Sequence, residues 1–429
     1  MRKLFKKLWN DERGNALIIA GASLPLIMGA AGLASDTIQW ALWKRELQRA
    51  ADSAAIAGVY AKVQGNSYSD AVTADLARNN DVAGITISTS SENSPTTGAY
   101  SSDPYAVRVR LSAQYKLSFS SMFMTATPTI KATGTATIVP SGKYCVVSLE
   151  NTSATGISIG GTANVDLGCG MITNSTSMDA AVAFGSSSVD ASPIAAVGGI
   201  EASDNWGDDV QLLPFTMAQA DPFADVNPPS VPNNCNSQIN IGPSTSNGNG
   251  NGNNSGNSTT PGCYSNISIN GNVTMTPGTY IIDGGDLDIG SQAHVTCDGC
   301  VFILTSKTAA TNPSSIGTVK INGGAEVDFS AIETGDYAGL IVYQDRRAVY
   351  DGSANTTNHI NGNSDSSFEG AFYFPSQVTQ FNGTAGMSTN CLQLVARRVE
   401  FSGTASISNT CPSGGPSQAF EGRTVRLVE

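Results

Sequence analysis

Residues 14–36 read "GNALIIAGASLPLIMGAAGLASD", and the run from Ala16 to Ala34 contains no charged side chain. As an α-helix rising about 1.5 Å per residue, this run spans roughly 28 Å, close to the ~30 Å hydrocarbon core of a bilayer. A removable secretory signal has a shorter apolar core and is normally followed by extended chain, but here the helical pattern continues through residues 36–63. The sequence therefore predicts a permanent transmembrane signal-anchor over residues 16–35. The alternative is a removable signal, in which Gly32 and Ala34 form the small-residue cleavage site.

The first 15 residues form a basic tip, in which Arg and Lys outnumber Asp and Glu. Positively charged flanks of a membrane helix stay on the cytoplasmic side. We therefore expect residues 1–15 in the cytoplasm and a single pass through the inner (cytoplasmic) membrane of a bacterium. Everything from Asp36 onward is then expected in the periplasm or outside the cell.

The composition fits an exported chain and argues against nucleic-acid binding. The formal net charge is −12, and no basic stripe with aromatic neighbours is present. All 8 cysteines follow the apolar run, and an even number outside the cytoplasm indicates disulfides. Many connectivities are open, and the simplest joins sequence neighbours. That pairing is Cys145–Cys169, Cys235–Cys263, Cys297–Cys300 and Cys391–Cys411.

A helix rich in small residues follows the apolar run, with "LQRAADSAAIAG" at Leu47–Gly58. Two strand-like segments come next, at residues 105–123 and 129–140. With Gly14, Pro25 and Asp36, these features resemble the TadE/TadG-like proteins of the Flp (tight adherence) pilus assembly system. The resemblance covers roughly the first third of the chain.

This resemblance implies a stem helix and a small α+β region over residues 36–140, with a structural role. The implied partners are the cytoplasmic membrane and other Tad pilus assembly proteins or pilins. Small residues allow close helix packing in membranes, so we expect one set of residues, with the Asp and Pro among them, to pack against the membrane or partner helices. They are Gly14, Pro25, Gly29, Gly32, Asp36, Ala50, Ala51, Asp52, Ala54 and Ala55.

One position departs from the pilin pattern. Pilin-like members of this family that are processed have a pattern in which cleavage follows a Gly and the fifth residue of the mature chain is Glu. Here Gly14 is followed by "NALII", and the fifth residue is Ile19. The resemblance therefore implies an unprocessed, TadG-like membrane component rather than a cleaved subunit.

A short fragment recurs from residue 141 to the C-terminus, with an apolar residue, small turn residues and then another apolar residue. Starts from Ile269 onward are separated by 20, 32, 39, 21 and 20 residues. A period near 20 with Gly or Asn corners predicts a mainly β domain over residues 141–429, a parallel and right-handed β-helix. A β-sandwich is the alternative fold. The copies start at Ile159, Ile269, Ile289, Ile321, Ile360, Phe381 and Phe401, with a further loose copy at Phe184.

A low-complexity insertion interrupts this domain at residues 203–262, where Asn, Gly and Ser dominate residues 244–258. Such tracts bury little apolar surface, so a spacer is expected rather than a contact loop. Segments such as "PGTYIIDGGDLDIG" at 277–290 also resemble a C-terminal β-helix domain of pilus-associated membrane proteins.

The sequence contains no residue pattern that predicts a catalytic, cofactor-binding or metal-binding site. His294 falls in a solvent-facing slot of the repeat, and "CDGC" at 297–300 fits a structural disulfide better than zinc or redox chemistry. The carboxylates of "DGGDLDIG" at 283–290 make a weak calcium candidate. "QDRR" at 344–347 resembles the basic residues of β-helix polysaccharide lyases, but a solvated loop with a local salt bridge explains it as well.

We therefore expect a membrane-anchored, non-enzymatic component of Flp pilus assembly that carries an extracytoplasmic β-helix scaffold or recognition surface. The alternative is a cell-surface adhesin or a polysaccharide-binding or -cleaving β-helix protein. The sequence identifies no glycan ligand.

Overall fold

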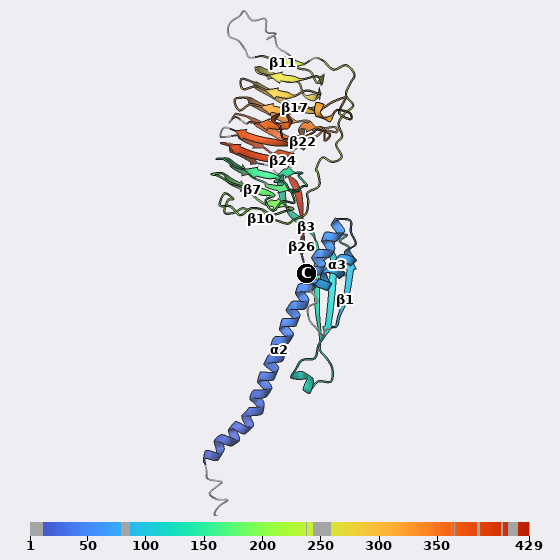
Figure 1. Cartoon of the computed structure of the whole chain (residues 1–429), viewed down its shortest axis with the longest axis vertical. Coiled ribbons are helices and arrows are strands. Elements are labelled where there is room, and N and C mark those ends of the chain that lie inside the picture. Colours follow the sequence, from blue (N-terminus) through green and yellow to red (C-terminus); the bar gives the residue numbers. More distant parts are fainter. Residues whose placement is uncertain are drawn as a thin grey trace, which may run out of the picture. The chain divides into compact units, whose positions relative to one another are not determined.

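The computed structural model describes residues 12–78, 86–236, 238–242, 259–361, 363, 365–383, 387–404, 406–410 and 419–428. By its internal contacts the chain divides into unit 1, Met1–Val139 with Val425–Glu429, and unit 2, Pro140–Thr424. Figure 1 shows the long helix of unit 1 and the tiers of strands of unit 2.

The main element of unit 1 is α2 (Glu12–Val63), a single helix of 52 residues that contains Pro25. The predicted continuity of the apolar run with the next stretch is therefore confirmed. Its part from Ile19 to Val63 is long and apolar enough to cross a membrane, and only 6% of the most apolar 18-residue window is buried. The apolar side chains of this region face outward instead of forming a core.

The second half of α2 packs on a small antiparallel sheet. The sheet has the order β1 (Thr86–Asn93), β2 (Val107–Gln114) and β3 (Thr129–Ser148), and α3 (Tyr68–Arg78) joins the helical side. Gly134 of β3 lies so close to α2 that a Cβ there would be 2.7 Å from the backbone of Ala51. Small residues on both surfaces thus let helix and sheet approach closely.

The part of β3 beyond Val139 enters unit 2, which is built of short strands, and each pairing described within unit 2 is parallel. The pairings form three stacks, and the chain passes through the stacks in turn. Two short 3-10 turns, η2 (Pro313–Ser315) and η3 (Ala354–Thr356), interrupt the loops. The remaining strands are β4 (Ile157–Ile159), β5 (Asn164–Leu167), β6 (Gly170–Thr173), β7 (Ala181–Ala183), β8 (Ser188–Ala191), β9 (Ile194–Ala196), β10 (Leu212–Leu213), β11 (Ile239–Ile241), β12 (Gly262–Tyr264), β13 (Ile267–Ile269), β14 (Asn272–Thr274), β15 (Gly278–Asp283), β16 (Leu287–Ile289), β17 (His294–Thr305), β18 (Val319–Ile321), β19 (Glu326–Ala331), β20 (Leu340–Gln344), β21 (Thr357–Ile360), β22 (Ser367–Gly383), β23 (Met387–Asn390), β24 (Leu392–Gly403), β25 (Ser406–Thr410) and β26 (Phe420–Leu427).

The first residues of the predicted repeats lie opposite one another in one stack. For example, Ile269 pairs with Ile289, and Phe381 pairs with Phe401. The start predicted at Phe184 is wrong by one residue. Ala183 takes the inward position opposite Ile159, and Phe184 is 52% exposed. A further member of the stack is Ile241, which lies in the predicted insertion. The stack runs Ile241, Ile269, Ile289, Ile321, Ile360, Phe381, Phe401, Ile159 and Ala183.

The spatial order of the strands differs from their order in the sequence. The last tier, with β24 and β25, pairs with β3, β4 and β5, although Phe401 and Ile159 are far apart in the chain. We call this contact the seam. Figure 1 shows β10 and β11 at opposite ends of unit 2, with the seam between β24 and β7.

Residues 214–236, here called the strap, connect these two ends along the outside of the stacks. Phe223 and Val226 of the strap pack against a buried cluster that includes Tyr343 and Tyr373. The backbone carbonyl of Val226 accepts a hydrogen bond from the Tyr343 hydroxyl at 3.0 Å. The described start of the predicted insertion is thus held by side-chain contacts, while residues 243–258 lie outside the described residues.

Candidate functional site

A loop between β2 and β3, residues 115–128, lies beside the apolar part of α2 (Figure 1). It contains the 3-10 turn η1 (Ser120–Met122), whose N-terminal amides point at Asp36 of α2. The carboxylate of Asp36 accepts hydrogen bonds from the Phe119 amide at 3.0 Å, and from the Ser120 amide and hydroxyl at 2.5 Å each. Asp36 is only 3% exposed, so it is a buried anchor for the loop and not a free charge.

One helical turn before Asp36, Gly32 makes room for an aromatic ring. A Cβ at Gly32 would lie 2.3 Å from the ring of Phe119, so any larger residue would displace that ring. On the other side of Asp36, Trp43 of α2 meets Tyr115 edge-on, with ring centroids 3.5 Å apart. The loop is therefore fixed to the helix at three levels.

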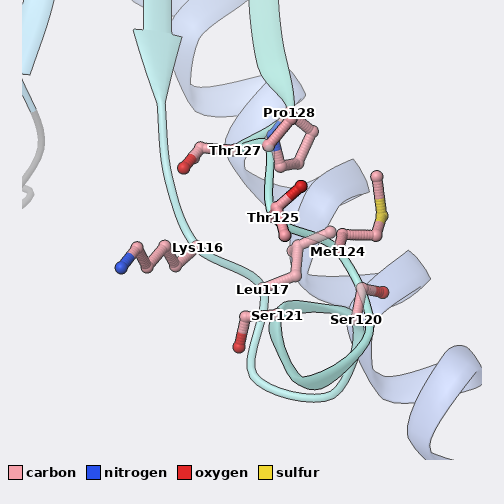
Figure 2. A pocket seen from close by; sticks show the side chains of 9 residues that line it. Lys116, Leu117, Ser120, Ser121, Met124, Thr125, Thr127 and Pro128 are labelled. Atoms are coloured by element: carbon pink, nitrogen blue, oxygen red, sulfur yellow. The ribbon is translucent and has the colours of Figure 1, made fainter.

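The tip of this loop presents large apolar side chains to its surroundings. Met122 is 75% exposed, Phe123 74% and Met124 52%. A cavity of about 390 Å³ lies within the loop. Figure 2 shows Leu117 and Met124 among its lining residues, with the Lys116 side chain extending away.

The alanines predicted to face partner helices are covered by this chain instead. Ala51, Ala54 and Ala55 are fully buried, and Ala50 is 6% exposed, all within the core shared with β2 and β3. In this structure their role is intramolecular, because the sheet of unit 1 occupies that face of α2. Neighbouring Asp52 accepts a hydrogen bond from Gln48 at 2.8 Å.

The remaining predicted packing residues lie in the apolar part of α2. The Phe119 ring occupies the space beside Gly32, whereas a Cβ at Gly29 would meet nothing within 4 Å. Pro25 is exposed, and Gly14 lies within the described span of α2. Of these positions, Gly29 and Pro25 therefore have surface that is open to lipid or to another helix.

Three of the four predicted disulfides are confirmed: Cys145–Cys169, Cys235–Cys263 and Cys297–Cys300. The first joins adjacent tiers, since Tyr144 pairs with Gly170. The second ties the end of the strap to β12. Cys391 is also disulfide-bonded, but Cys411 lies outside the described residues.

The "QDRR" segment is not a solvated loop, because its side chains bind one another and the strap. Asp345 is fully buried and pairs with Arg347 at 2.5 Å, as the local salt bridge predicts. Burial alone would raise the pKa of Asp345, but hydrogen bonds from Arg347 and Thr305 outweigh it and lower the pKa. Arg346 donates to the strap carbonyls of Ala224 at 2.9 Å and Phe223 at 3.0 Å. Both guanidinium groups therefore have protein partners.

The other candidate chemical groups are also engaged. Asp283 pairs with Lys307 at 2.8 Å, and Asp286 accepts a hydrogen bond from the Thr318 amide at 2.7 Å. Among the described residues, no three His, Cys, Asp or Glu side chains are grouped to hold a metal ion. His294 is exposed, as predicted, and contacts Glu326 at 2.5 Å.

Sequence reasoning missed the loop at 115–128 as a site. The signal that was available is "FSSMFM" at 119–124, an apolar cluster with no acidic residue in a connecting segment. Its contact with Asp36 joins residues 83 positions apart, which no local pattern encodes.

Comparison with known proteins places only the N-terminal region. No curated protein and no solved structure matches the chain. Residues 14–62 match the family described as "Putative Flp pilus-assembly TadE/G-like". The matched region contains the apolar run, Asp36 and the buried alanines of α2.

Proposed function

We propose that this chain is a membrane-anchored, non-enzymatic structural component of Flp pilus assembly. The observation that carries the proposal is a coincidence in residues 14–62: they match the TadE/G-like family and form a helix with an exposed apolar surface. A continuous apolar surface of that length is unstable in water and matches the thickness of a bilayer.

The proposed topology follows from charge and from the disulfides. The basic tip keeps the N-terminus in the cytoplasm, and the chain after Asp36 lies in the periplasm or outside the cell. Disulfides such as Cys145–Cys169 form and persist in that oxidising environment. In this arrangement α2 crosses the inner membrane once.

We further infer that unit 2 is a parallel β-helix that serves as a scaffold or recognition surface. Three stacks of parallel strands with Ile and Phe in register support this inference. A cysteine pair tests it at the seam: Asp166 and Ser408 are exposed and directly opposite. Neighbouring strands lie about 4.8 Å apart, within the reach of a disulfide.

D166C/S408C should therefore oxidise to a new disulfide, detected by mass spectrometry of the joined peptides. The matched control is D190C/S408C, because Asp190 lies one tier beyond Asp166. A β-sandwich gives no reason for the first pair to react and the second to stay reduced.

The function itself is tested by fractionation. The C-terminus is tagged, the cells are sheared, and the intact mass of the protein is measured in the filament and inner-membrane fractions. Full-length protein confined to the membrane supports an unprocessed assembly component. Protein shortened near Gly14 in the filaments would instead identify a pilin, and a soluble species cut near Ala34 would refute the anchor.

A further inference from the structure

We propose that the loop at residues 115–128 inserts its tip, Met122–Met124, into the membrane leaflet on the Asp36 side of α2. The occupant of this exposed apolar surface is thus phospholipid and not a second protein. The proposal rests on the proposed function in one respect, because it requires α2 to cross a bilayer.

The depth of the loop is set by its contacts with α2. Asp36 holds the Phe119 and Ser120 amides, and the Phe119 ring rests on Gly32. Gly32 lies one turn, about 6 Å along the helix axis, on the apolar side of Asp36. Interfacial segments bury their apolar face roughly 5–10 Å into the boundary between head groups and acyl chains, so the loop reaches the depth at which such segments bind.

The aromatic residues around Asp36 indicate the same level. Trp40 is 42% exposed, and Trp43 contacts Tyr115 at the base of the loop. Trp and Tyr are enriched at membrane–water interfaces, where an apolar ring and a polar group are both accommodated. The interface inferred from these rings therefore coincides with the loop.

The surface chemistry of the loop fits a lipid leaflet. Residues 115–128 contain one charged side chain, Lys116, and no acidic one. A lysine beside apolar side chains favours anionic head groups, whereas an acidic loop would be repelled by them. Ile27, Met28 and Leu33 of α2 are also exposed, so the helix around Gly32 presents apolar side chains as the loop tip does.

The experiment places an environment-sensitive NBD fluorophore on a single introduced cysteine in the full-length protein, reconstituted at one copy per lipid nanodisc. None of the described cysteines is a free thiol that would compete for the fluorophore. The three positions are Phe123 at the tip, Leu26 in the anchor and Ser88 in β1. All three native side chains are exposed, and Phe123 also contacts the Phe119 ring at a centroid distance of 5.4 Å.

We expect the Phe123 probe to show blue-shifted emission and several-fold stronger quenching by a nitroxide near the lipid head group than by one deep in the acyl chain. The Leu26 probe should show the opposite preference, and the Ser88 probe should emit as in water. If the Leu26 probe is lipid-quenched and the Phe123 probe emits as in water, the loop proposal is overturned while the anchor stands. If the Leu26 probe also emits as in water, the anchor itself has failed.

A matched pair of variants ties insertion to the docking contact. G32A should displace Phe119 and reduce quenching of the Phe123 probe severalfold, while G29A, with open space around it, should leave quenching unchanged. Equal quenching in both variants would show that the loop is not held at this depth by Gly32. The lipid assignment would be overturned if the Phe123 position crosslinked to another protein in cells while the Phe123 probe emitted as in water in nanodiscs.

Discussion

The core of unit 1 is built mainly from small side chains, whereas the core of unit 2 is built from large ones. Unit 1 buries mainly Ala and Val, with Ala51, Ala54 and Ala55 against the sheet. Unit 2 buries rows of Ile, Phe and Tyr, in which Phe302 lies between Tyr280 and Phe329 at centroid distances of 5.4 and 5.1 Å. Unit 1 therefore depends on close approach of backbones, whereas unit 2 depends on side chains that fill its interior. Unit 1 should therefore be sensitive to added atoms and unit 2 to removed atoms.

The largest effect is expected from removing an aromatic ring in unit 2. F302A deletes a fully buried ring and should lower the free energy of unfolding of unit 2 by about 3–5 kcal/mol, through lost burial and a cavity. Chemical denaturation followed by intrinsic fluorescence measures the loss. F184A is the matched control, because this ring is 52% exposed, and it should cost about 0.5 kcal/mol or less.

The converse substitution adds one methyl group to unit 1. G134A places a Cβ 2.7 Å from the Ala51 backbone, which cannot move aside as a side-chain end can. The overpacking should cost about 1–3 kcal/mol, seen as faster proteolysis of unit 1 in the intact chain. The adjacent T133A removes atoms at an exposed position and should behave as the parent. A G134A protein as resistant as the parent would break the proposed contrast between the units.

The seam should show a third, electrostatic sensitivity. Glu150 is 1% exposed and accepts hydrogen bonds from Arg397 at 3.1 Å and Arg398 at 2.6 Å, both from the last tier. E150Q should cost about 1–3 kcal/mol in the unfolding free energy of unit 2 at pH 7. E201Q, at an exposed position, is the control.

The pH dependence of this effect follows from the pKa of Glu150. Burial would raise this pKa, but the hydrogen bonds from Thr152 and Arg398 outweigh burial and lower it. A carboxyl group with a lowered folded pKa contributes stability that is present above its unfolded pKa and lost as the pH falls through the folded value. The difference between parent and E150Q should therefore shrink below about pH 4, as denaturation at several pH values would measure. A constant difference down to pH 3 would contradict the ionic role.

The smallest global effect is expected at the strap. R346A removes the donors to Phe223 and Ala224 but leaves the stacks intact, so unfolding of unit 2 should change by about 1 kcal/mol or less. Amide hydrogen exchange of residues 221–227 should nevertheless become faster. R423A, at an exposed position, should leave that exchange unchanged.

The sequence could predict features that repeat or run continuously. The apolar run extends into an unbroken α2, and Ile or Phe at each repeat start lies in one stack, because every tier places an inward residue before a small corner. Three neighbouring cysteine pairs are also joined. The one-residue error at Phe184 arose because Ala183 is a weaker hydrophobic signal than the ring beside it.

The sequence could not predict which of several similar strand edges or helix faces contact each other. Each tier offers the same parallel edges, so nothing local states that Phe401 pairs with Ile159. The alanines of α2 fit a partner helix or a sheet equally well, and only the presence of Gly134 opposite Ala51 decides between them. Asp36 and the loop at 115–128 meet through a side chain and two amides that share no sequence pattern.

The seam has a consequence for how the chain is made. A chain that emerges N-terminus first completes β4 and β5 long before β24 and β25, their neighbours, exist. Until then these early strands carry open edges, on which any passing extended segment could pair. The parallel ladder thus becomes continuous only when β24 and β25 have been synthesised. Deletion of β24 and β25 should consequently destabilise β4 and β5 as well as the last tier.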